Sequence, residues 1–164
     1  MDIIDFSATQ KQEPVKQHPA LPNSIRAISI GPSGSGKTHL LLNLIMRWIK
    51  WDKLYLVAPS VYDQICYNVL KYFNENAKLL DEYGNDIIDF ITNIDEAPSV
   101  DDRDGFINNL VLYDDVMLDK QSNPARIFSR CRHKNTDVTY VTQRYTQIPK
   151  RSETTEIFWL CLME

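Results

Sequence analysis

The octapeptide Gly31-Pro32-Ser33-Gly34-Ser35-Gly36-Lys37-Thr38 constrains this chain of 164 residues more than any other feature. It matches GxxxxGK[ST], in which glycines let successive backbone N–H groups turn inward around a phosphate. A β-prone run over 25–30 precedes it, and apolar residues at helical spacing follow over 38–50. This order of strand, glycine-rich loop and helix predicts a phosphate-binding loop at the positive end of the helix. An ordinary glycine-rich turn between a strand and a helix would show the same order.

Each part of this loop has an expected task. Lys37 is placed to neutralise the β- and γ-phosphates, and the Thr38 hydroxyl can ligate Mg²⁺. The residues expected to contact the nucleotide are Gly31, Pro32, Ser33, Gly34, Ser35, Gly36, Lys37, Thr38 and His39.

A second motif lies at Leu110-Val111-Leu112-Tyr113, an apolar strand followed by two acids. Parallel α/β sheets bind their ligands at the carboxyl ends of the strands, so this pair would lie beside the phosphate-binding loop. We expect Asp114 to hold Mg²⁺ and Asp115 to orient or deprotonate an attacking water. A solvated strand end would show the same two acids.

The strand predicted at 138–142 ends in Gln143. A glutamine there can bridge the γ-phosphate and the attacking water, or it can simply cap the strand. The segment Asp102-Arg103-Asp104-Gly105 matches the DxxG pattern of GTPases, but a loop precedes it and no Asn-Lys-x-Asp motif follows. ATP is therefore the expected nucleotide, rather than GTP.

The remaining pattern predicts strands and helices in alternation. Further strands are expected at 54–58 and 157–162, and a weaker strand pattern lies at 87–94. Helices are expected over 61–73 and 126–132. Alternating strands and helices predict an α/β fold: a mainly parallel sheet with helices on both faces.

Charge is distributed unevenly along the chain, although the net charge is only −4. Residues 75–119 carry 13 acidic and 2 basic side chains, whereas residues 120–151 carry 8 basic side chains and one acidic. This contrast fits two solvated faces, and it equally fits a basic face that meets phosphates. The basic segment Arg130, Arg132, His133 and Lys134 is a candidate for an arginine finger or a DNA phosphate contact, with a solvated helix end as the alternative.

Composition and cysteine spacing limit the cellular location expected for the protein. No run of about 18 apolar residues predicts a membrane-spanning helix, and acidic residues stand where a signal peptide needs basic ones. Three single, widely spaced cysteines indicate a reducing compartment: Cys66, Cys131 and Cys161. A soluble intracellular protein without a membrane partner is expected.

Together these motifs resemble the genome-packaging ATPases of poxviruses and other large DNA viruses, which belong to the FtsK–HerA superfamily. The resemblance runs from residue 25 to about residue 150. The segments that carry it are Gly-Pro-Ser-Gly-Ser-Gly-Lys-Thr, Leu-Tyr-Leu-Val-Ala-Pro-Ser, Tyr-Asp-Asp, Cys-Arg-His-Lys-Asn, Tyr-Val-Thr-Gln and Ile-Pro-Lys.

The resemblance implies a RecA-like P-loop NTPase core in which the Gln143 strand lies between the strands of Lys37 and Asp114. It implies ATP and Mg²⁺ as ligands, with Lys37, Asp115, Gln143 and Arg132 as the catalytic residues. The implied partners are double-stranded DNA, further copies of the chain in a ring, and a viral capsid or portal vertex at an intracellular assembly site.

The expected organisation is an N-terminal arm over 1–24 and an ATPase domain over 25–164. The family pattern continues with an Arg followed shortly by Asn, but residues 151–155 lack that Asn, so we expect the domain to be incomplete at its C-terminus. The expected function is ATP-driven DNA packaging. A small-molecule kinase and a nucleotide-binding fragment without turnover are the two alternatives.

Overall fold

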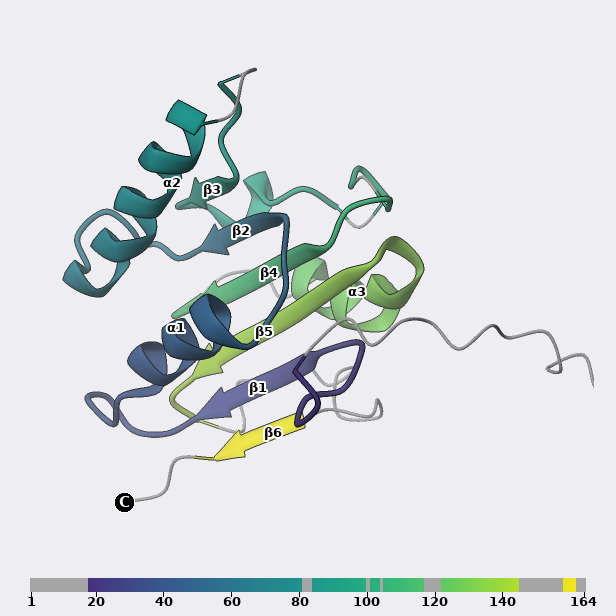
Figure 1. The fold of residues 1–164 in the computed structure, drawn as a ribbon. Helices are drawn as coiled ribbons and strands as arrows, with labels where there is room; N and C mark the ends of the chain where they lie inside the picture. Colours follow the sequence, from purple (N-terminus) through teal and green to yellow (C-terminus); the bar gives the residue numbers. More distant parts are fainter. Residues whose placement is uncertain are drawn as a thin grey trace, which may run out of the picture.

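A computed structural model describes residues 18–80, 84–99, 101–103, 105–116, 122–144 and 158–161. Within these residues the chain forms a six-stranded sheet in the order β3-β2-β4-β5-β1-β6, and every neighbouring pair is parallel. The strands are β1 (Arg26–Ile30), β2 (Lys53–Val57), β3 (Ile88–Ile91), β4 (Asn109–Asp114), β5 (Thr136–Thr142) and β6 (Phe158–Cys161). Figure 1 shows all six arrows pointing to the same side.

Helices cover both faces of this sheet, as the alternating pattern predicts (Figure 1). The helices are α1 (Lys37–Arg47), α2 (Asn68–Leu80) and α3 (Ser122–Arg130), with three short 3-10 helices η1 (Ile65–Tyr67), η2 (Ile94–Glu96) and η3 (Cys131–Lys134). Helices α1 and α2 pack on one face, and α3 packs on the other. The expected α/β architecture is therefore confirmed.

Strand β4 shows how the sequence divides the core between the two faces. Successive side chains of a strand point to opposite faces, so Leu110 and Leu112 join the cluster under α1 and α2. Val111 and Tyr113 join the cluster under α3 instead. All six residues of β4 are buried, which explains its nearly continuous apolar run. By this alternation Asp114 belongs to the α1 side.

The order of the central strands places the candidate motifs side by side. Strand β5 lies between β1 and β4, so the position expected for the Gln143 strand is confirmed. Ile30 pairs with Thr142, and Asp114 pairs with Val141. The residues that follow these strands therefore lie together at the carboxyl ends of the strands.

The helix expected over 61–73 is displaced in the structure. Residues 59–63 form turns, in which Val61 N–H donates to the Ala58 carbonyl and Gln64 N–H donates to the Ser60 carbonyl. Gln64 has an extended backbone, so the helix cannot run through it. Helix η1 then leads into α2, which continues to Leu80, seven residues beyond the expected end.

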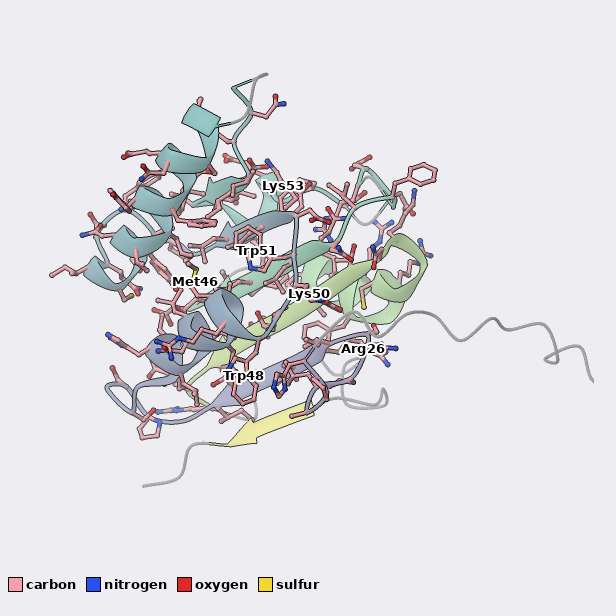
Figure 2. All side chains as sticks on the ribbon, viewed as in Figure 1. Arg26, Met46, Trp48, Lys50, Trp51 and Lys53 are labelled. Carbon is pink, nitrogen blue, oxygen red and sulfur yellow. The ribbon has the colours of Figure 1, made fainter. Side chains whose placement is uncertain are left out.

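Residues 18–24 pack against the end of α1. The His18 ring stacks on the Trp48 ring with centroids 4.3 Å apart, and His18 N–H donates to the Trp48 carbonyl. Figure 2 shows Trp48, with Met46 and Trp51, around the C-terminal end of α1. Residues 1–17 of the expected N-terminal arm lie outside the described residues.

Candidate nucleotide-binding site

The glycine-rich loop joins β1 to α1 at the carboxyl edge of the sheet. Gly34 and Gly36 have φ angles of 81° and 84°, a left-handed conformation that residues with a Cβ rarely adopt. A Cβ at either position would meet no heavy atom within 4 Å, so the backbone conformation, not crowding, requires glycine. The loop then ends directly in the first turn of α1, where Leu40 N–H donates to the Gly36 carbonyl.

Lys37 is buried and lies along the inside of the loop. Its Nζ donates hydrogen bonds to the carbonyl oxygens of Gly31, at 2.7 Å, and Pro32, at 2.6 Å. The side chain is only 8% exposed, so its charge is held at the loop and cannot move freely into solvent. This arrangement fixes one positive charge where the loop would meet a phosphate.

Asp114 connects three separate segments of the chain. Its Oδ2 accepts a hydrogen bond of 3.3 Å from the Thr38 hydroxyl, and the same oxygen accepts a short hydrogen bond from the Tyr67 hydroxyl. Thr38 lies in the first turn of α1, whereas Tyr67 is the last residue of η1. The carboxylate is therefore held from both sides at the end of β4.

The surroundings of Asp114 disfavour its negative charge overall. Asp114 is 5% exposed, and this burial raises the pKa of its carboxyl group above the ordinary value. The nearby Asp115 raises that pKa further, whereas the hydrogen bonds from Tyr67 and Thr38 and the charge of Lys37 lower it. A buried carboxylate of this kind would be stabilised by a cation placed in the pocket.

A pocket of about 400 Å³ gathers the expected residues at this edge. Asp115 and Gln143 are exposed and line it, and Asp115 has a φ of 56°, a left-handed conformation that aspartate tolerates better than most residues. The lining residues are Ser33, Gly34, Gly36, Lys37, Thr38, His39, Gln64, Cys66, Asp114, Asp115, Val141, Thr142 and Gln143. The structure thus brings together the three motifs expected to form one site.

One side of the pocket is formed by residues that none of the sequence motifs predicts. Gln64 and Cys66 line the pocket, and Tyr67 lies behind them against Asp114. Gln64 is held by a hydrogen bond of 2.6 Å from its Nε2 to the Ser60 hydroxyl. These residues follow β2, the neighbour of β4, and their place at the carboxyl edge is the signal that could have identified them.

The basic segment lies at the opposite end of the strands, next to the amino end of β5. Helix η3, which contains Arg132 and His133, comes directly before β5, whereas the pocket lies beyond its far end. The seven residues of β5 span about 20 Å. The backbone of one copy therefore does not bring Arg132 to its own pocket.

The donor chemistry of the pocket fits Mg²⁺. Mg²⁺ prefers oxygen ligands and is commonly held by one or two carboxylates together with substrate phosphates. The Thr38 hydroxyl and the Asp114 carboxylate supply such oxygens within hydrogen-bond distance of each other. Within the described ranges there is no group of three or more His, Cys, Asp or Glu residues that could hold a metal by itself.

The parallel sheet, the glycine-rich loop between β1 and α1, and the acid at the end of β4 define a P-loop NTPase of the α/β class. The chain belongs to the family of the poxvirus A32 protein, whose family model matches residues 16–164. This is a family of packaging ATPases of the FtsK–HerA type. No curated protein and no solved structure gives a significant match to the chain. None of the helices in the described ranges combines the length and the hydropathy that crossing a lipid bilayer requires.

Proposed function

We propose that this protein binds ATP with Mg²⁺ and hydrolyses it to drive double-stranded DNA into a viral capsid. The observation that carries the proposal is the meeting of Lys37, Thr38, Asp114, Asp115 and Gln143 at one pocket. Membership in a family of viral packaging ATPases supports the same function. The protein would act at the intracellular site of virus assembly.

Each side chain has a distinct part in the proposed reaction. Lys37 balances the charge of the β- and γ-phosphates, while the loop from Gly31 to Gly36 and the following His39 hold the nucleotide. Thr38 and Asp114 would hold Mg²⁺, which when bound neutralises charge that develops on the phosphate oxygens. Asp115 orients the attacking water and accepts its proton, and Gln143 contacts the water and the γ-phosphate.

The proposed motor is a ring of identical subunits. Because η3 lies at the amino end of β5 and the pocket lies beyond its carboxyl end, Arg132 would contact the pocket of a neighbouring subunit. In a head-to-tail ring every subunit both offers a pocket and serves the next one. Double-stranded DNA and the capsid or portal vertex are the further proposed partners.

The test is phosphate release from ATP by the purified protein, with and without double-stranded DNA, over a range of protein concentrations. Lys37→Ala serves as the blank. Turnover stimulated by DNA and rising faster than linearly with protein concentration is expected, because sites shared between subunits form only on assembly.

Three other outcomes would contradict the proposal in different ways. ATP binding without phosphate release above the blank would show a nucleotide-binding protein without turnover. Phosphoryl transfer to a nucleoside monophosphate would show a kinase. Turnover that is independent of DNA would show an ATPase without the proposed coupling.

A further inference from the structure

Tyr67 makes a contact with the candidate site that no motif predicts. Its side chain is fully buried, at 0% exposure, and its hydroxyl donates a short hydrogen bond to Oδ2 of Asp114. An ionised carboxylate can only accept hydrogen bonds, so the Tyr67 hydroxyl is the donor in this pair. The interaction joins a neutral donor to a buried acid.

The hydrogen bonds of Asp114 are unequally divided between its two oxygens. Both donors in the described part of the chain, Tyr67 and Thr38, reach Oδ2. The residue nevertheless lines the pocket. Two donors on one oxygen fix the rotation of the carboxylate and leave the other oxygen free of hydrogen bonds from described residues.

We propose that Tyr67 is a positioning residue that orients the Asp114 carboxylate for Mg²⁺ bound with the nucleotide. The inference rests on the proposed function, since it assumes a nucleotide–Mg²⁺ complex in this pocket. Tyr67 is not among the residues that line the pocket, so it would act through Asp114. A buried hydrogen bond that orients a metal ligand typically changes metal affinity 10–100-fold when it is removed.

Tyr67 and Thr38 together restrict the rotation of that carboxylate, because both donate to Oδ2. Loss of the Tyr67 hydroxyl should therefore weaken Mg²⁺ binding, because the carboxylate gains rotational freedom. Nucleotide contacts that do not involve Mg²⁺ should remain.

The test compares Tyr67→Phe with a matched control, Tyr113→Phe. Both tyrosines are fully buried, and Phe retains the ring that packs in the core. Tyr113 adjoins Asp114 in β4 but lies on the opposite face, where its hydroxyl is close to the Arg103 guanidinium. The control therefore removes a buried hydroxyl without removing a contact to the carboxylate.

The measurement is the affinity for a fluorescent ATP analogue, in EDTA and across a Mg²⁺ titration, which requires no turnover. Tyr67→Phe should bind the analogue in EDTA like the wild type and need about tenfold more Mg²⁺ for the half-maximal effect. Tyr113→Phe should follow the wild type. In an Asp114→Asn background, Tyr67→Phe should have no further effect on the Mg²⁺ requirement.

An unchanged or lower Mg²⁺ requirement in Tyr67→Phe, with a wild type that responds to Mg²⁺, would overturn the role of Tyr67 and leave the proposed function intact. A Mg²⁺ requirement raised equally in Tyr113→Phe would also overturn it, because the effect would then be structural. A wild type that does not bind the analogue, or binds it without any effect of Mg²⁺, would instead overturn the proposed function.

Discussion

The Thr38 hydroxyl and the Asp114 carboxylate lie 3.3 Å apart and are joined by a hydrogen bond, although 76 positions separate them in the chain. Thr38 lies in the first turn of α1, after the glycine-rich loop, and Asp114 ends β4. Strand β5 lies between β1 and β4, so the contact crosses the carboxyl edge of the sheet above β5. The parallel arrangement of three strands therefore creates the candidate Mg²⁺ site.

The first prediction concerns Lys37. Lys37→Ala should weaken ATP binding by about 100-fold or more, because it removes the buried charge, held at the glycine-rich loop, that would face the phosphates in the proposed site. Binding can be measured by equilibrium titration with a fluorescent ATP analogue. Lys53→Ala is a suitable control, because Lys53 pairs with Asp89 in β3 at the start of β2, away from the pocket. ATP binding by Lys37→Ala at the wild-type affinity would remove this loop from the site.

The motifs at the strand ends were predictable, because each combines a local pattern with a general rule of parallel sheets. A glycine-rich loop between a strand and a helix specifies its own backbone, and the φ angles of Gly34 and Gly36 agree with that reading. The run from Leu110 to Tyr113 is buried on both faces, and such strands end at the ligand edge.

The segment from Gln64 to Tyr67, which forms and supports one side of the pocket, was not predictable from apolar spacing. The helix expected over 61–73 was inferred from Ile65, Val69, Leu70 and Phe73, yet only Leu70 of these is buried. The buried face contains Tyr67 and Asn74 instead, and the Asn74 carboxamide accepts hydrogen bonds from Ile87 and Ile88 N–H. Polar residues that the core satisfies through long-range hydrogen bonds leave no hydrophobic period in the sequence.

A second prediction separates binding from turnover at Asp115. Asp115→Asn should bind ATP like the wild type and lose about 100-fold or more of the phosphate release, because an amide cannot accept the proton of the attacking water. Asparagine also tolerates the left-handed backbone at this position, where φ is 56°, so the fold should not change. Asp101→Asn, in an exposed loop, is the control. Equal hydrolysis by Asp115→Asn and the wild type would exclude Asp115 from the mechanism.

A third prediction concerns the stability of the protein without ligands. Burial raises the pKa of Asp114, so the folded state binds its proton more tightly than the unfolded state does. The free energy of unfolding contributed by this residue therefore falls as pH rises from the ordinary aspartate pKa through the raised one. Asp114→Asn keeps an acceptor for Tyr67 and Thr38 and should raise Tm at pH 7, by about 2–4 °C per kcal/mol gained.

This advantage should shrink as pH is lowered through the raised pKa of Asp114, because the wild-type carboxyl group is then neutral as well. Thermal unfolding of both proteins from pH 4 to pH 8, without Mg²⁺ or nucleotide, measures the difference. A Tm for Asp114→Asn that is lower than the wild-type value at pH 7 would show that the charge of Asp114 is stabilising in the fold.

A fourth prediction uses Cys66 as a reporter of the pocket. Burial raises the pKa of its thiol, and the Asp114 charge raises it further, so the reactive thiolate should form only above the usual thiol range. In a Cys161→Ser background, alkylation should modify Cys66 rather than the fully buried Cys131, and its rate should increase with pH. MgATP should slow the reaction severalfold, because Cys66 lines the pocket. Mass spectrometry of the peptide identifies the site, and no protection by MgATP would place the nucleotide elsewhere.

The final prediction tests whether Arg132 acts between subunits. Helix η3 lies at the amino end of β5 and the pocket lies beyond its carboxyl end, so the backbone of one copy does not bring Arg132 to the pocket of the same copy.

Lys37→Ala and Arg132→Ala should each abolish DNA-stimulated phosphate release. In a mixture of the two, an intact pocket from the Arg132→Ala protein can meet an intact Arg132 from the Lys37→Ala protein. Random head-to-tail rings would contain such an interface at about a quarter of their junctions, so activity should partly return. Arg126→Ala, on the exposed side of α3, should remain active alone and serves as the control. If the mixture stays inactive while Arg132→Ala still assembles, Arg132 does not act in a neighbouring site.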